Sequence, residues 1–70
     1  MYVDVQKLKG RIVEKGTTQE AVADSIGIDR STFYRKIKNQ GASFSIGEIH
    51  KIAAVIPLTK EEAIDIFLAQ

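Results

Sequence analysis

The sequence lacks the residues that stabilise very small domains through covalent or metal links. It has 70 residues, no cysteine, no tryptophan, one proline and one histidine. Without cysteine, neither a disulfide nor a thiolate metal site can hold the chain together. No apolar run approaches the roughly 20 residues that cross a bilayer, and the N-terminus lacks the basic and apolar blocks of a signal peptide. We therefore expect a single cytoplasmic domain over residues 1–70, with no membrane partner.

The net charge is only +1, but the charges are unevenly distributed. Residues 1–40 contain eight Lys or Arg and five Asp or Glu, a net charge of +3, whereas residues 41–70 contain two and four, a net charge of −2. A basic N-terminal half is typical of a protein with one surface that faces phosphates. An ordinary solvated surface explains the charges about equally well, so charge alone leaves both interpretations open.

Start and stop signals along the chain predict five helices and no strand. Polar caps precede five segments whose apolar residues recur at helical spacing, and these caps are Asp4, Thr17, Asp29, Ser45 and Thr59. Three caps have a glutamate three positions later, which completes a capping box, at Glu20, Glu48 and Glu62. Gly16 and Gly27 are expected to end the first two helices, and Pro57 bars extension of the fourth. The fold class predicted is all-α.

The segment from residue 19 to residue 38 reads as a helix, a turn and a second helix, with Gly27 in the turn. Ala23 is small where the helices should cross, and glycine adopts a positive φ at little cost. The residues expected to form the inward face are Val22, Ile26, Ile28, Phe33 and Ile37. A helix pair joined by a glycine-containing turn is the helix-turn-helix pattern.

This segment is similar to the DNA-binding motif of the phage repressor and Cro family, the XRE-like proteins. The resemblance lies in Gln19-Glu20-x-Val22-Ala23-Asp24-x-x-Gly27. The five-helix layout, which ends in Leu58-Thr59-Lys60-Glu61-Glu62…Ile66-Phe67, resembles the short Cro/CI-like regulators of Gram-positive phages and prophages over essentially the whole chain. The resemblance implies a compact five-helix lambda-repressor-like DNA-binding domain with its helix-turn-helix at residues 18–38. One position departs from the pattern, because Lys36 stands where many members have an apolar residue.

The same resemblance implies a function. It indicates a sequence-specific regulator of transcription, a phage or prophage repressor that binds a palindromic operator in double-stranded DNA as a homodimer. The compartment would be the bacterial cytoplasm or that of a phage-infected host. The alternative is a helical module that binds a protein, such as an antitoxin or an antirepressor-like factor.

The first turn of the second helix of such a motif reaches base edges in the major groove. The polar face of that helix supplies the candidate base-reading residues Arg30, Ser31, Tyr34 and Arg35. A cation in a first turn opposes the helix macrodipole, so folding gives no reason for Arg30, whereas bidentate pairing with a guanine does. The candidate phosphate contacts are Gln19, Thr32, Lys36, Lys38 and Asn39.

Each candidate also has a plainer explanation. Ser31 is a good first-turn residue, the ring of Tyr34 could be partly buried, and Lys36 and Lys38 suit a helix C-terminus electrostatically. The basic residues expected to be solvated surface are Lys7, Lys9, Arg11 and Lys15.

Catalytic chemistry is not indicated. His50 stands alone, without a second histidine or a phosphate-cradling glycine loop, and the adjacent Glu61 and Glu62 do not face each other. We expect no enzyme, no metal, no cofactor and no small-molecule substrate.

The fifth helix is apolar on more than one side, with Ile64, Ile66, Phe67 and Leu68. This surface either binds a partner subunit or simply covers the core of the other helices.

Overall fold

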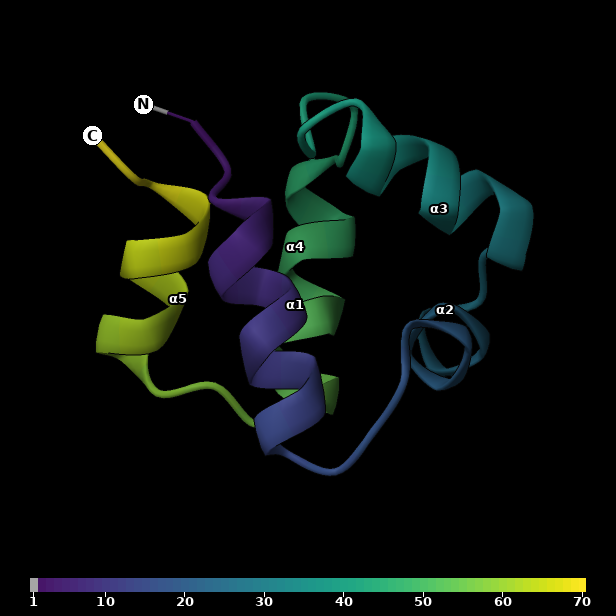
Figure 1. The fold of residues 1–70 in the computed structure, drawn as a ribbon, viewed down its shortest axis with the longest axis horizontal. Helices are drawn as coiled ribbons and strands as arrows, with labels where there is room; N and C mark the ends of the chain where they lie inside the picture. Colours follow the sequence, from purple (N-terminus) through teal and green to yellow (C-terminus); the bar gives the residue numbers. More distant parts are fainter. Residues whose placement is uncertain (1) are drawn as a thin grey trace.

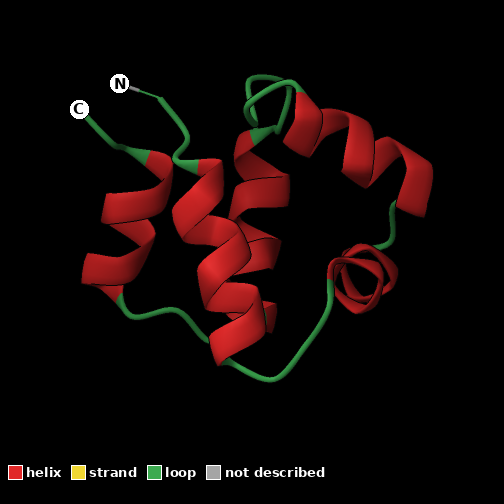
Figure 2. Ribbon diagram, viewed as in Figure 1, coloured by secondary structure: helices red, strands yellow, loops and turns green. Residues whose placement is uncertain are grey.

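The computed structural model describes residues 2–70, which form five helices (Figures 1 and 2). Their bounds are α1 Val5–Glu14, α2 Gln19–Ile26, α3 Arg30–Lys38, α4 Ile46–Val55 and α5 Lys60–Phe67. Within residues 2–70, extended backbone pairs only in a single bridge between Tyr2 and Ala69. The predicted all-α class is thus confirmed. None of the helices in this range has the length and apolarity that a membrane crossing requires.

The helices form two groups joined through α4. In Figure 1, α5 lies beside α1 at one end of the molecule, and α3 lies with α2 at the other. Helix α2 also packs on α4, which links the two groups. The chain ends meet next to α5, where the Tyr2 and Ala69 N–H groups each donate to the other residue's carbonyl oxygen at 3.0 Å.

The core draws apolar side chains from all five helices. Phe33 of α3 is completely buried, and its ring centroid lies 5.6 Å from that of Phe44 in the loop before α4. The largest fully buried side chains are Phe33, Leu8, Ile12, Ile52, Ile56, Ile66 and Val22. Because these residues come from α1 to α5 together, the helix-turn-helix is held rigidly against the rest of the domain.

Four of the five predicted caps are confirmed. Asp4 and Asp29 accept hydrogen bonds from first-turn N–H groups, and Ser45 and Thr59 form complete capping boxes with Glu48 and Glu62.

The predicted cap at Thr17 is wrong. The Thr17 N–H donates to the Ile12 carbonyl oxygen at 3.1 Å, while Gly16, at φ +75°, donates to that of Val13. Thr17 therefore belongs to the C-terminal turn of α1. The cap of α2 is Thr18, whose Oγ1 accepts from the Ala21 N–H at 3.1 Å.

The loop between α3 and α4 turns sharply at Gly41, which has φ +71°. Its N–H donates to the Lys36 carbonyl oxygen at 2.8 Å. A Cβ at position 41 would lie 2.7 Å from Cγ1 of Val3, closer than carbon atoms can approach. The site thus requires glycine both for its backbone angle and for the space beside the N-terminal segment.

Candidate nucleic-acid interface

The turn between α2 and α3 has the predicted geometry. Gly27 ends α2 in the left-handed conformation, at φ +79°, and the Ile28 N–H donates to the Ala23 carbonyl oxygen at 3.1 Å. Asp29 begins α3, because its Oδ2 accepts from the N–H groups of Ser31 and Thr32 at 2.9 and 3.3 Å. Ala23 is fully buried where the two helices cross. These local contacts fix the direction in which α3 leaves the turn.

One face of α3 is polar and exposed. It carries Ser31, Tyr34, Arg35, Lys38 and, at the helix end, Asn39. Phe33 and Ile37 are buried on the opposite face, as predicted, and the inward set also includes Val22 and Ile26, with Ile28 partly buried. On the exposed side, Arg35 donates from Nη2 to Oγ1 of Thr32 at 3.1 Å.

Arg30 has a partner within the fold. Its Nη2 donates to Oδ2 of Asp24 at 2.7 Å and its Nε to Oδ1 at 3.2 Å, so the two planar groups pair edge to edge across the turn. This hydrogen-bonded pair lowers the pKa of Asp24 and raises that of Arg30. The expectation that folding gives no reason for Arg30 is therefore wrong. The pair is nevertheless open to solvent, with side-chain exposures of 58% for Arg30 and 55% for Asp24.

Lys36 lies on the other edge of α3, in a more enclosed place. Its Nζ donates to Oε1 of Glu48 at 2.9 Å and to the Ser43 carbonyl oxygen at 3.0 Å, and lies 5.8 Å from the centre of the Phe44 ring. Both side chains of the Lys36–Glu48 pair are only 19% exposed. The Ser45 N–H, and then Lys36, hold the pKa of Glu48 below its usual value. This engagement argues against the predicted phosphate contact for Lys36 and explains a lysine at a position usually apolar.

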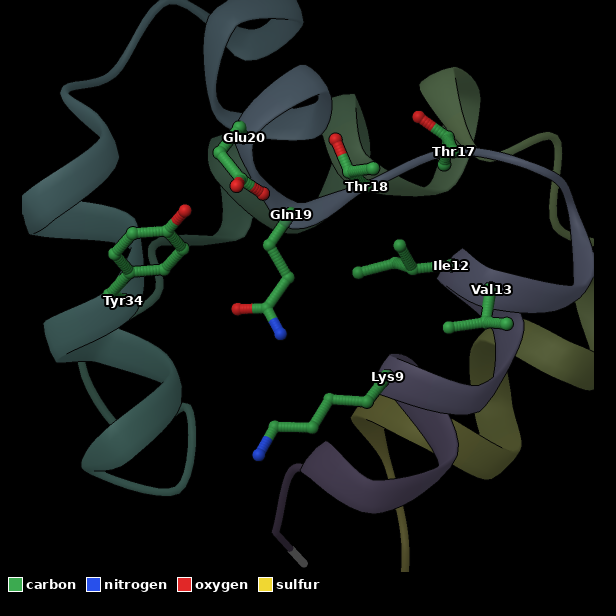
Figure 3. A pocket seen from close by; sticks show the side chains of 8 residues that line it. All are labelled: Lys9, Ile12, Val13, Thr17, Thr18, Gln19, Glu20 and Tyr34. Atoms are coloured by element: carbon green, nitrogen blue, oxygen red, sulfur yellow. The ribbon is translucent and has the colours of Figure 1, made fainter.

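Beside the exposed face of α3 lies a groove of about 500 Å³, called here the α1–α3 groove (Figure 3). It is lined by Lys9, Ile12 and Val13 of α1, Thr17 and Thr18 of the connecting loop, Gln19 and Glu20 of α2, and Tyr34 of α3. Partial desolvation, and then the nearby Glu20 carboxylate, raise the pKa of Tyr34. Tyr34 is 41% exposed and lines the groove, so its ring is partly covered, which is the alternative that the sequence left open.

Lys9 was expected to be solvated surface, but it is half-buried and lines this groove. At about 100° per residue it lies about 40° from Val5 on the helical wheel, so it flanks the apolar stripe of α1. This position beside the apolar stripe is the feature of the sequence that indicates its location, because a lysine next to the stripe lies close to the helices that pack on it.

Arg11 of α1 and Lys15, just after α1, face α5. Arg11 lies 3.4 Å and Lys15 3.8 Å from the carboxylate oxygens of Glu62 on α5. The Thr59 N–H, and then these cations, lower the pKa of Glu62. Within residues 2–70, by contrast, Lys9, Arg35 and Lys38 make no ion pair. These three cations leave unpaired positive charge on and beside the exposed face of α3, whereas Arg11 and Lys15 on the α5 side pair with acidic residues.

A second, apolar groove of about 320 Å³ separates α4 from α5, called here the α4–α5 groove. Ile46 on its rim is 82% exposed, and Ile64 and Leu68 are 45% and 48% exposed. Ile66 and Phe67 of the same helix pack into the core. The fifth helix thus divides its apolar residues between the core and the surface. No group of three potential metal ligands occurs in the part of the chain that the structure describes.

A family described as the Cro/C1-type HTH DNA-binding domain matches residues 7–66 of this sequence. The chain belongs to this family. The match includes all of the helix-turn-helix and most of α1 and α5, so it agrees with the resemblance seen in the sequence. No curated protein and no solved structure gave a significant match. This Cro/C1-type domain is accordingly a DNA-binding helix-turn-helix domain.

Proposed function

We propose that this Cro/C1-type domain is a sequence-specific regulator of transcription that inserts α3 into the major groove of double-stranded DNA. The observation that carries the proposal is the exposed polar face of α3, which is fixed by buried packing behind it and carries Arg35 and Lys38 without an ion pair among residues 2–70. A helix held in this way can present side chains to base edges in one register. We further propose that it is a repressor from a phage or prophage, acting by binding alone.

Arg30, Ser31 and Arg35 are the proposed base-reading residues, with Tyr34 beside them. Asp24 takes up the Nε and one Nη2 hydrogen of Arg30, which leaves its Nη1 end free to donate. A guanidinium oriented from one side in this way is suited to bidentate pairing with guanine. The Thr32 hydroxyl accepts from Arg35 and would orient it in the same manner.

The proposed phosphate contacts are Gln19 at the start of α2, Thr32 on α3, and Lys38 and Asn39 at the end of α3. The Thr32 hydroxyl accepts from Arg35, which leaves its O–H free to donate to a phosphate. Lys36 is left out because its ammonium group is held by Glu48. Contacts from the start of α2 and from the end of α3 would fix the position of the recognition helix against the DNA backbone.

We propose a homodimer on a palindromic operator. The domain measures only 28 × 23 × 20 Å, and one module of this size buries too little DNA surface for strong binding. Two copies joined through the α4–α5 groove would hide Ile46, Ile64 and Leu68 from water. Their recognition helices must then lie about 34–36 Å apart to enter successive major grooves.

The test is selection of bound sites from random duplexes, followed by affinity measurements on the selected site and a scrambled control over a range of salt. We expect enrichment of an inverted repeat and affinity that falls steeply as salt rises. Absence of binding to any duplex at about 50 mM salt would overturn the proposal.

The exposed α4–α5 groove favours one second candidate, a module that holds a protein partner such as an antitoxin or antirepressor-like factor. If this candidate is right, the domain should not bind duplex DNA at any salt concentration. It should be a monomer alone and form a heterodimer with its protein partner. Sedimentation of the purified domain, alone and with the selected duplex, separates the two functions.

A further inference from the structure

The α1–α3 groove directly adjoins the exposed face of α3. Tyr34 lies on the exposed face of α3 and also lines the groove. Gln19, at the start of α2, lines the groove together with residues of α1. The volume of about 500 Å³ is many times the roughly 30 Å³ that a water molecule occupies in the liquid. The groove therefore has room for part of a polymer backbone.

The charge within the groove is positive at one end. Lys9 is half-buried, and among residues 2–70 it makes no ion pair and no hydrogen bond from its side chain. In the view of Figure 3, the Gln19 side chain lies between the Lys9 ammonium group and the Glu20 carboxylate. The Glu20 carboxylate and the Tyr34 ring lie at the other end of the groove, away from Lys9. An anion therefore fits beside Lys9 and Gln19 and not beside Glu20.

We propose that the α1–α3 groove receives the sugar–phosphate backbone of one DNA strand, with Lys9 contacting a phosphate outside the helix-turn-helix. The inference rests on the proposed function, since it extends the same DNA-binding surface onto α1. Lys9 and the Gln19 amide provide the donors for one phosphate, and Val13 and the Tyr34 ring provide apolar walls for the adjoining sugar. Tyr34 then contacts the backbone and reads no base.

Charge is the reason to prefer a DNA strand as the occupant. Lys9 is the cation of α1 that faces α2 and α3, whereas Arg11 and Lys15 face Glu62. The Lys9 ammonium group has no partner among residues 2–70, and a phosphate oxygen would give it a charge-assisted hydrogen bond in the complex.

The first experiment compares Lys9→Ala with Lys7→Ala on the selected duplex. Lys7 is exposed and lies about 160° from Lys9 around α1, so it serves as the matched control. Affinity is measured at several salt concentrations, and thermal unfolding of each variant establishes that it folds. We expect Lys9→Ala to reduce the slope of log K against log salt by about 0.9 per protomer, or about 1.8 for the homodimer, and to weaken binding of the dimer roughly 30- to 100-fold at 0.1 M salt. Lys7→Ala and Lys9→Arg should keep the wild-type slope.

The preference for the selected duplex over a scrambled one should stay unchanged in Lys9→Ala, because a phosphate contact carries no sequence information. If the wild type binds the selected duplex and Lys9→Ala keeps its full slope, the groove inference is overturned while the proposed function stands. If the wild type binds no duplex, the proposed function itself has failed.

The second experiment is ethylation interference on the selected duplex, which reports phosphates whose modification blocks binding. Wild-type protein should show interference at a phosphate flanking each half-site, and Lys9→Ala should lose that one position. Tyr34→Phe should leave the base preference unchanged. A changed preference would assign Tyr34 to base reading and overturn this part of the inference.

Discussion

Each edge of α3 carries one ion pair, but the two pairs differ in how far they are exposed to solvent. On the edge facing α2, Arg30 pairs with Asp24 in the open, whereas on the edge facing α4, Lys36 pairs with Glu48 in a place that is only 19% exposed. The Lys36 ammonium group also donates a hydrogen bond to the Ser43 carbonyl oxygen in the loop, so two of its three N–H donors are used within the protein. Arg30 keeps free donors at the surface. A basic residue near a helix end is therefore available to DNA only where its acidic partner leaves it accessible.

The edge facing α4 continues into the loop at Gly41, and we expect the largest loss of stability there. Gly41→Ala should lower the free energy of unfolding by about 2–4 kcal/mol, because it combines a positive φ with a clash against Val3. Chemical denaturation measures the change. Gly10→Ala is the control, since a Cβ there meets nothing within 4 Å and α1 should gain about 0.5–1 kcal/mol. Equal stability of the two variants would contradict the packing of the N-terminal segment on this loop.

On the edge facing α2, Arg30→Ala should weaken binding to the selected duplex roughly 10- to 100-fold per half-site and relax the preference at one base pair of each half-site. Its melting temperature should stay close to that of the wild type, because the Arg30–Asp24 pair is exposed.

Asp24→Asn is the matched variant, because it keeps Arg30 but weakens the contact that orients it. We expect a smaller loss of affinity and a broader base preference. An Arg30→Ala protein with unchanged affinity and preference would show that Arg30 serves only the fold.

Lys36→Ala should show the opposite balance. We expect a loss of stability of about 1 kcal/mol, because Glu48 loses its cation and the stem of Lys36 no longer covers Phe44. Corrected for the folded fraction, its affinity for the selected duplex should match the wild type.

Lys38→Ala, which removes an exposed cation without an ion pair among residues 2–70, should keep the stability and reduce the salt slope by about 0.9 per protomer, or about 1.8 for the homodimer. A lower salt slope in Lys36→Ala would return that lysine to the DNA-contacting set.

The smallest expected effect is in acid. The pKa of Glu48 is lowered in the folded protein, whereas in the unfolded chain it keeps its ordinary value of 4.5. Below pH 4.5 the unfolded chain therefore binds more protons than the folded protein, and the free energy of unfolding decreases as the pH is lowered. This contribution is complete above pH 4.5 and is lost as the pH drops through the folded-state pKa. Unfolding measured from pH 6 to about pH 3 should therefore be less pH-dependent in Glu48→Gln than in the wild type. Glu61→Gln, which removes an exposed carboxylate outside the capping boxes, should keep the wild-type dependence.

The sequence predicts those parts of the fold that depend on nearby residues. Asp4, Asp29, Ser45 and Thr59 begin helices because each cap bonds an N–H two or three positions away. Gly27 ends α2 for an equally local reason. Thr17 was misassigned because the end of α1 competes for the same residues.

Contacts between elements could not be predicted from such patterns. Asp24 meets Arg30 across six positions and a turn, and Lys36 meets Glu48 across twelve positions and a loop. The role of Lys9 depends on how α1 packs beside α2 and α3, which no single helix pattern contains. The sequence therefore found the recognition helix and its polar face, but not which of its cations are engaged within the protein.

The most direct test of the claim that α3 reads DNA sequence is site selection from random duplexes, run in parallel with the wild type and Arg30→Ala. The wild type should enrich an inverted repeat with a strong preference, expected to be guanine, at one position of each half-site. Arg30→Ala should enrich the same repeat with that position relaxed. Identical motifs from both proteins, or no enrichment by the wild type, would contradict the claim.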